Sequence, residues 1–317
     1  MKKKRRIKKS VIKIFALALI IIIAVIFITN RIRYINSYSY KLSKKGYSKN
    51  EITEIKKLDN KEIDTLLNKD YNKLTVKFMK QKYFIFSNLD KYISYYKNSD
   101  NDTLSHTISM VNVRANYDYY DKKAVTKTNE KDGNLMLVNK YHNLTKNYTP
   151  TDLVKVKNYY AYGDNEIKKE VYEAFLKMWN DAKKENLTLI ITSAYRDYDY
   201  QEKLWNSYSS ANGEDWADSV AARAGFSEHQ TGLTLDIVTY NSTMNNFENS
   251  DEFKWLSKNA YKYGFILRYP KGKEEITGYS YESWHYRYVG IENAKKIHNE
   301  NITFDEYYAY YIENKKE

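Results

Sequence analysis

The chain contains no cysteine, only two prolines and only ten glycines among its 317 residues. Without cysteine it cannot form disulfide bonds, thiolate metal sites or a cysteine nucleophile. Any metal site must therefore use histidine, aspartate and glutamate, and the chain has only five histidines. The glycine signatures of P-loop and dinucleotide-binding proteins are absent, as are the G-x-S-x-G pattern of serine hydrolases and the H-E-x-x-H pattern of many zinc proteases.

Acidic residues are missing from the N-terminal segment, where the positive charge is concentrated. Residues 1–33 hold ten lysines and arginines and no acidic residue, so most of the net charge of +12 comes from this segment. Residues 14–29 are all uncharged, and the apolar run extends back to Val11 because Lys13 can snorkel. Segment 11–29 is therefore long enough to cross a bilayer. The charge reflects membrane topology and does not indicate nucleic-acid binding.

The residues after the apolar run favour an uncleaved anchor over a cleaved signal peptide. The sequence TNRIRY at 29–34 lacks the small residues of a cleavage site, and a lipoprotein cysteine is absent. Eight cations precede the run and two follow it, which puts the N-terminus in the cytoplasm. We predict a cytoplasmic basic tail at 1–10, a single transmembrane signal anchor at 11–29 and an external remainder.

The external part divides into two regions by its sequence pattern. Residues 30–103 contain short helical patterns, including a capping box at Ser48 and Glu51, and predict a helical stalk or subdomain. Residues 104–317 mix helices and strands without a regular strand–helix–strand repeat, which predicts an α+β fold with a small, mostly antiparallel sheet flanked by helices. Strands are predicted at 107–114, 134–141, 188–195, 231–239, 265–270 and 283–290. Helices are predicted at 165–187, 198–208, 215–225 and 251–264, with two more at the C-terminus.

The predicted strand 231–239 carries a carboxylate toward which a histidine can fold back. Side chains alternate along a strand, so Asp236 points away from the main apolar row of this strand. His229 precedes Asp236 by seven residues, and Gly232 lies between them at a position suited to a turn. A chain reversal at Gly232 would bring the two side chains to one point.

A second pair, Glu282 and His285, lies about fifty residues downstream. In a regular strand the two side chains would face opposite sides, so Glu282 must lie in the turn that enters the strand if both serve one site. Hydrolytic zinc sites use three His or carboxylate ligands and a further carboxylate as proton acceptor. The spacing also allows an ordinary interpretation, with packed core histidines, an aspartate at the edge of a sheet and a surface glutamate.

Several motifs, in order along the chain, strongly resemble the zinc D-Ala-D-Ala carboxypeptidases of the VanY type. The family pattern S-x-H-x-x-G-x-x-x-D matches Ser227, His229, Gly232 and Asp236. Its E-x-W-H pattern matches Glu282, Trp284 and His285. SAYRDYDYQ resembles its arginine strand and supplies Arg196 and Gln201. The resemblance covers roughly residues 137–290, within a predicted carboxypeptidase domain at 104–317, and implies the fold shared by hedgehog proteins and D,D-peptidases.

The resemblance implies a role for each matched side chain. It implies a zinc ion (Zn²⁺) on His229, Asp236 and His285, and Glu282 as the residue that takes the proton of a water molecule and gives it to the leaving amine. Arg196 would stabilise the oxyanion. The substrate-binding residues would be Ser227, Gln201 and Arg196.

The implied substrate is the stem peptide of peptidoglycan, which lies outside the bacterial cell membrane. We therefore expect a single-pass membrane protein with an extracellular catalytic domain that removes the C-terminal D-Ala from stem pentapeptides. An L,D-carboxypeptidase or a peptidoglycan endopeptidase on the same scaffold remains an alternative, and a non-catalytic wall-binding protein is a further one. Other roles also stay open for three residues: Arg196 could pair with Asp197 or Asp199, Ser227 could cap a turn, and Gln201 could face solvent.

Overall fold

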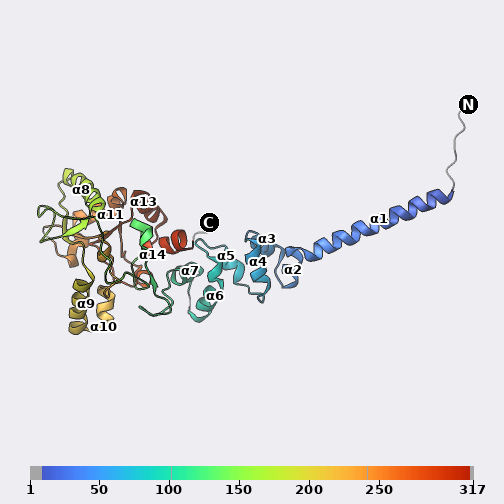
Figure 1. Ribbon diagram of the computed structural model, residues 1–317, viewed down its shortest axis with the longest axis horizontal. Coiled ribbons are helices and arrows are strands. Elements are labelled where there is room, and N and C mark those ends of the chain that lie inside the picture. The colour runs from blue at the N-terminus through green and yellow to red at the C-terminus, as the bar shows by residue number, and fades with distance from the viewer. Residues whose placement is uncertain (1–8, 101, 241, 315–317) are drawn as a thin grey trace, which may run out of the picture. The chain divides into compact units, whose positions relative to one another are not determined.

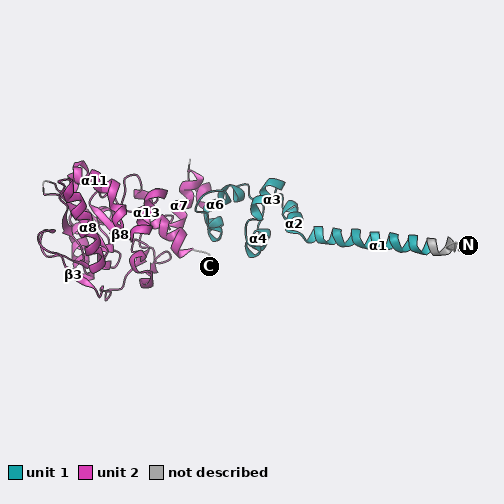
Figure 2. Ribbon diagram, turned by 90° about the horizontal axis from the view of Figure 1, so that it is seen from above, with its two compact units in different colours: residues 1–93 teal, residues 94–317 magenta. Residues whose placement is uncertain are grey.

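The computed structural model describes residues 9–100, 102–240 and 242–314. The chain divides into two compact units, residues 1–93 and residues 94–317 (Figure 2). Residues 1–8 of the predicted basic tail lie outside the described residues.

The first unit begins with helix α1 (Lys9–Asn36), which contains the apolar run. Its stretch Lys13–Asn36 is long and apolar enough to cross a membrane, and the side chains of that stretch are not packed inside the protein. By length and composition it fits a single-pass anchor or a signal sequence.

Short helices make up the rest of the first unit, as the sequence predicts for a helical subdomain. They are α2 (Tyr38–Lys44), α3 (Lys49–Ile55), α4 (Asn60–Leu67), α5 (Thr75–Met79), η1 (Phe86–Asn88) and the start of α6 (Leu89–Asn98). The predicted capping box is confirmed at α3: the hydroxyl of Ser48 accepts the backbone N–H of Glu51, whose carboxylate accepts the backbone N–H of Ser48 at 2.8 Å. Such caps satisfy N–H groups that the first helical turn leaves free.

The second unit contains a four-stranded antiparallel sheet, which confirms the predicted type of sheet. Its strands are β5 (Ile190–Ser193), β6 (Thr234–Val238), β7 (Phe265–Leu267) and β8 (His285–Tyr288), in the order β5-β6-β8-β7. Two small sheets pair β1 (Thr126–Lys127) with β2 (His142–Asn143) and β3 (Leu153–Lys155) with β4 (Glu166–Lys168).

The remaining regular structure of the second unit is helical (Figure 1). The longer ones are α7 (Leu104–Asn112), α8 (Lys169–Lys184), α9 (Tyr198–Asn212), α10 (Glu214–Val220), α11 (Asp251–Asn259) and α13 (Ile291–Glu300). Shorter ones are η2 (Glu130–Leu135), η3 (Glu228–Thr231), η4 (Met244–Asn249), η5 (Ala260–Tyr263), α12 (Glu274–Thr277), α14 (Phe304–Tyr308) and η6 (Ala309–Glu313). Helices α9 and α10 lie side by side as a hairpin (Figure 1).

The core lies between α8 and the four-stranded sheet. The helix predicted at 165–187 is confirmed as α8, although it begins only at Lys169 because the preceding residues form β4. Its buried side chains are Val171, Ala174, Phe175, Met178, Trp179 and Ala182. They belong to the same hydrophobic cluster as Leu235 and Ile237 of β6. Burial of this apolar area fixes β6, and with it Asp236, in the middle of the unit.

Two predicted strands are wrong. Residues 107–114 lie largely in helix α7, whose first turn is capped by Thr103, because the Thr103 hydroxyl accepts the backbone N–H of His106 at 3.1 Å. Residues 134–141 include the end of η2 and then an irregular segment that buries its apolar side chains without joining the four-stranded sheet. In both segments tertiary burial and capping outweigh the strand propensity of Val, Ile and Met.

Candidate metal centre and its cleft

Strands β6 and β8 bring the two halves of the predicted site together. Their antiparallel register sets Asp236 directly opposite His285. Asp236 is 3% exposed and His285 5% exposed, so both polar side chains are held inside the protein, where they need partners. The fifty residues between the two motifs are therefore no barrier to one site.

The turn at Gly232 brings in His229, as predicted. His229 lies on η3, which Ser227 begins as the N-cap residue and Gly232 ends with a φ of +67°, in the left-handed region. A Cβ at this position would lie 3.0 Å from Leu153 Cδ2 and 3.1 Å from Lys168 Cγ. Glycine is favoured here because it avoids both the backbone strain and these contacts.

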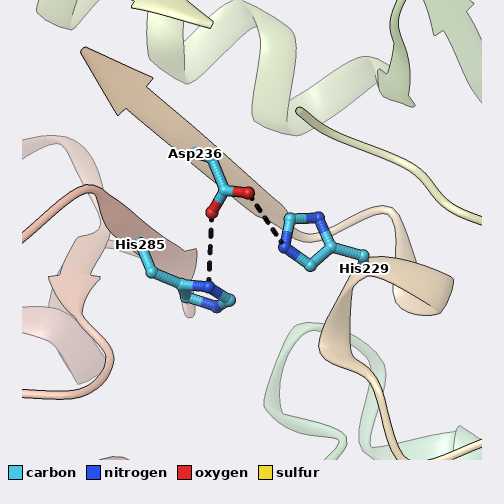
Figure 3. Close-up of side chains that lie close together, drawn as sticks. All are labelled: His229, Asp236 and His285. Atoms are coloured by element: carbon cyan, nitrogen blue, oxygen red, sulfur yellow. Dashed lines mark ion pairs between the residues drawn. The ribbon is translucent and has the colours of Figure 1, made fainter. Parts of the chain in front are cut away.

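The three side chains point toward a common centre (Figure 3). His229 Nε2 lies 3.5 Å from Asp236 Oδ2, and His285 Nδ1 lies 3.3 Å from Asp236 Oδ1. One donor atom from each residue falls within 4.8 Å of the others. His229 Nε2 and Asp236 Oδ1 are buried and have no hydrogen-bond partner in the part of the chain that the structure describes. Buried donor atoms left without partners are the condition that a bound cation satisfies.

The outer nitrogen of His229 fixes which ring atom faces the centre. Its Nδ1 lies 2.6 Å from the carbonyl oxygen of Ala194, so Nδ1 carries the proton and donates it. Nε2 therefore presents a lone pair to the centre. Two imidazoles and one carboxylate with this outer support are the ligand set of a hydrolytic zinc site, and the donor set fits zinc.

Glu282 lies just before β8, in the turn where the sequence predicts it. Its Oε2 is 3.2 Å from His285 Nδ1, and the side chain is largely buried. Burial raises the pKa of the Glu282 carboxyl. Glu282 is not one of the three donors and adjoins them, which suits a residue that exchanges protons beside a metal.

The pKa shifts of the donors reflect burial and their mutual charges. Burial, followed by the charge of Arg196, lowers the pKa of His229 to about 4. Burial also opposes the charge of His285, but its carboxylate neighbours outweigh that effect and raise its pKa well above the usual range. Burial favours the neutral form of Asp236, yet the two imidazoles hold its pKa below the usual range. Asp236 is thus ionised and His229 neutral, which are the forms that bind cations, whereas His285 has to release a proton when it binds one.

The donors open into a cavity of about 470 Å³. Side chains from the α9–α10 hairpin form part of its lining, namely Tyr200, Leu204, Tyr208, Trp216 and Val220. Ser227, Trp284 and Arg196 also line it. The cavity is large enough to hold a peptide segment next to the donors.

Arg196 lies between β5 and α9 and faces the same cavity as the donors. The ion pairs that would give it a purely structural role do not occur among the described residues. Asp197 instead caps α9 by accepting the backbone N–H of Tyr200, and Asp199 pairs with Lys146 at 2.7 Å. Arg196 Nε is buried and has no hydrogen-bond partner within the described ranges. Its guanidinium is thus available to a ligand in the cavity.

Ser227 and Gln201 are both buried. The Ser227 hydroxyl accepts the backbone N–H of His229 at 3.4 Å, so this residue does cap the turn, and it also lines the cavity. Gln201 is 1% exposed and does not face solvent; its amide N–H donates to the carbonyl of Ala222 at 2.7 Å. In this geometry Gln201 ties α9 to the segment before Ser227, and a direct role in substrate binding stays a prediction.

A further carboxylate lies at the centre that the sequence motifs did not indicate: Glu228, the residue before His229. Its Oε2 lies 3.8 Å from His285 Nε2. Its Oε1 accepts from Arg268 Nε and from Arg287 Nη1, both at 2.8 Å. Burial raises the pKa of Glu228, but the two arginine charges outweigh it and hold that pKa well below its usual range. Nothing in the local sequence indicates these partners, which lie forty and fifty-nine residues away.

An α+β domain with a buried pair of histidines, an aspartate and an adjoining glutamate is of the zinc-hydrolase class. Residues 164–291 match the family model of VanY, described as D-alanyl-D-alanine carboxypeptidase. The chain is 33% identical over 183 residues to the bifunctional D-Ala-D-Ala dipeptidase and D-Ala-D-Ala carboxypeptidase VanXYC of Enterococcus gallinarum, covering 56% of this chain and 94% of that protein. The chain belongs to the VanY family.

Two further relatives define the range of the likeness. The putative carboxypeptidase YodJ of Bacillus subtilis is 44% identical over 184 residues, which cover 55% of this chain and 66% of that protein. The solved structure of the LdcB LD-carboxypeptidase has a TM-score of 0.56 and 39% identity, and the match covers 61% of this chain and 94% of that one. The chain spans 63–66% of the length of the first curated relatives that it matches, just under two thirds.

Proposed function

We propose that this protein is a zinc-dependent D,D-carboxypeptidase that removes the C-terminal D-Ala from peptidoglycan stem pentapeptides. The observation that carries the proposal is the convergence of His229, Asp236 and His285 beside Glu282, in a cavity that Arg196 also lines. We further propose that segment 11–29 anchors the protein in the cell membrane. The stalk at 30–103 and the domain at 104–317 would then lie outside, where peptidoglycan is found.

Each side chain has a task that its position supports. When bound, zinc acts as a Lewis acid that polarises a carbonyl and lowers the pKa of water toward neutral. His229, Asp236 and His285 would hold it. Glu282 would accept a proton from the attacking water and pass it to the leaving amine, which suits a carboxyl whose pKa burial has raised.

Arg196 would stabilise the negative charge that develops on the carbonyl oxygen. Its Nε has no partner in the described part of the protein, so a substrate oxygen would meet a guanidinium that need not first break an ion pair. Ser227 lines the same cavity and would hold the substrate backbone or its terminal carboxylate, with Gln201 supporting the turn behind it. Donors fixed before the substrate arrives contribute most, because they need no reorganisation during the reaction.

A second candidate is an L,D-carboxypeptidase that acts on tetrapeptides. The likeness to the LdcB LD-carboxypeptidase favours it, because that match has 39% identity and includes 94% of the LdcB chain. The two activities share the metal, the proton acceptor and the arginine. They differ in the residue that precedes the scissile bond. We expect the cavity wall formed by α9 and α10 to contact that residue and so to determine which substrate is cleaved.

The test uses the full chain in detergent, with synthetic stem pentapeptide and tetrapeptide as substrates and mass spectrometry of the products. We expect release of one D-Ala from the pentapeptide, loss of this activity with EDTA and recovery with zinc. Glu282→Gln should lower kcat by about 10²–10⁴-fold. Glu275→Gln, an exposed carboxylate on α12, is the matched control and should leave kcat unchanged.

The products separate the alternatives. Release only from the tetrapeptide would replace the D,D-activity with the L,D-activity. Metal-independent release, or a Glu282→Gln variant with normal kcat, would contradict the mechanism. Retention of peptidoglycan without any product would favour the non-catalytic wall-binding protein.

A further inference from the structure

Two fully buried arginines lie behind the metal centre. Arg268 follows β7 and Arg287 lies on β8, and both are 0% exposed. A buried guanidinium is strongly unfavourable unless ionised partners surround it. Both arginines donate to the same oxygen, Oε1 of Glu228, at 2.8 Å.

A second carboxylate balances this cluster. Asp305 on α14 accepts from Arg268 through both oxygens, at 2.5 Å from Nη1 and 3.1 Å from Nη2. Asn139 donates to Asp305 Oδ1 at 2.8 Å. Two positive and two negative groups therefore balance in the interior, and their bidentate geometry leaves little freedom to move.

One oxygen of this cluster, Oε2 of Glu228, is not bound by the arginines and lies beside the metal centre. Both arginines bind Oε1 of Glu228, so Oε2 is left buried and without a hydrogen-bond partner among the described residues. Nε2 of His285 lies 3.8 Å from it and is also buried and without a hydrogen-bond partner among these residues. The opposite ring nitrogen, Nδ1, is the one that faces Asp236.

The two orphaned atoms are complementary. An imidazole that offers Nδ1 to a metal carries its proton on Nε2. That proton requires an acceptor, and Oε2 of Glu228 needs to approach by only about 1 Å to reach hydrogen-bond distance. Among the described residues Nε2 has no hydrogen-bond partner that would compete with Glu228.

We propose that Glu228 is a positioning residue of the metal centre: its carboxylate accepts a hydrogen bond from Nε2–H of His285 and so directs Nδ1 toward the metal. Arg268, Arg287 and Asp305 hold that carboxylate in place. The inference rests on the metal site of the proposed function. It also gives a role to α14, which lies outside the matched segment 164–291: Asp305 on this helix helps to hold Glu228 in place through Arg268. Outer-shell carboxylates of this kind affect metal affinity about 10–100-fold.

The experiment measures metal binding and does not depend on turnover. The full chain in detergent is stripped of metal and titrated with zinc against a chromophoric chelator, and its cobalt(II) form is examined by visible absorption. Glu228→Gln should weaken zinc binding by about 10–100-fold and alter the cobalt spectrum, because the amide cannot serve both arginines and His285. Asp305→Asn should weaken binding less, since it acts through Arg268.

Asp218→Asn is the matched control. Asp218 is a buried carboxylate on α10 that pairs with Arg223 at 2.8 Å, and it is not among the residues that line the cavity. This variant should lose stability without any change in zinc affinity or in the cobalt spectrum. Should Glu228→Gln not fold, Asp305→Asn and Glu228→Asp provide the same comparison, with the shorter carboxylate of the latter retracted from His285.

The outcomes distinguish this inference from the proposed function. If Glu228→Gln and Asp305→Asn lower the melting temperature yet bind zinc as tightly as the unmodified protein, with the same cobalt spectrum, the cluster is purely structural and the inference is wrong. If the unmodified protein binds no zinc, both proposals fail. If it binds zinc and the variants weaken binding, but no stem peptide is cleaved, the role of Glu228 stands and the hydrolase proposal fails.

Discussion

The turn at Gly232 offers a direct test of how the fold presents His229 to Asp236. Its φ of +67° lies in the left-handed region, where a residue with a Cβ costs about 1–2 kcal/mol. The new Cβ would also lie 3.0 Å from Leu153 Cδ2 and 3.1 Å from Lys168 Cγ, both in flexible side chains, and crowding of this kind costs about 1 kcal/mol. Gly232→Ala should therefore destabilise the second unit by about 2–3 kcal/mol.

A second glycine separates the two contributions. Gly272 has a φ of +77°, but nothing lies within 4 Å of a Cβ at that position. Gly272→Ala should therefore lose only the backbone contribution of about 1–2 kcal/mol. The difference between the two variants measures the contacts at Gly232 alone.

The natural fluorophores suit this assay. All five tryptophans lie between residues 179 and 284, so urea unfolding followed by their fluorescence reports on the second unit. Gly232→Ala should also weaken zinc binding, because the turn sets the distance from His229 to Asp236, whereas Gly272→Ala should not. Equal free-energy losses for the two variants, or a loss below about 0.5 kcal/mol for Gly232→Ala, would refute the reasoning.

Three other predictions concern the cleft and its surroundings. Arg196→Met should lower kcat by about 10²–10³-fold with little change in KM, and a change in KM alone would count against an oxyanion role. Trp216→Ala, which removes an aromatic side chain from the cavity wall, should raise KM for stem peptides several-fold and leave kcat unchanged; an unaltered KM would exclude this wall from binding. Burial lowers the pKa of Lys140 to about 8. Above pH 8 the unfolded chain therefore binds more protons than the folded protein, and folding becomes more stable as the pH rises. The difference in unfolding free energy between the unmodified protein and Lys140→Met should rise by about 1 kcal/mol per pH unit from pH 8 to 10. A difference that does not change with pH would contradict the lowered pKa.

Local patterns predicted where the side chains of the site lie, but their spacing left an ordinary interpretation open, and the roles of these residues came from the family resemblance. The alternation along β6, the turn at Gly232 and the placement of Glu282 before β8 each depend on a few neighbouring residues. All three are confirmed: Leu235 and Ile237 lie in the core whereas Asp236 lines the cavity, Gly232 ends η3, and Glu282 precedes β8. They succeed because a buried antiparallel strand and a left-handed turn leave little choice of side chain. The predicted antiparallel sheet and the predicted helix α8 are also confirmed.

Interactions distant in sequence could not be predicted in this way. Arginine is usually a surface residue, so the sequence gives no sign that Arg268 and Arg287 are buried. Only the folded chain shows that Glu228 and Asp305 neutralise their charges inside the protein. The wrong strand at 107–114 has a similar cause. Its apolar run fits a strand or a helix, and the choice is made by the cap at Thr103 and by burial against other segments.

The position of Asp305 has a practical consequence for anyone who shortens or transplants this domain. A fragment limited to segment 164–291 would keep all three candidate metal ligands and all the matched sequence motifs of the site, so its sequence would look complete. It would nonetheless leave Arg268 and Arg287 competing for one carboxylate in a dry interior, a defect that costs about 3–5 kcal/mol when a buried pair is broken. The smallest portable piece should therefore extend through Tyr308, the last residue of α14.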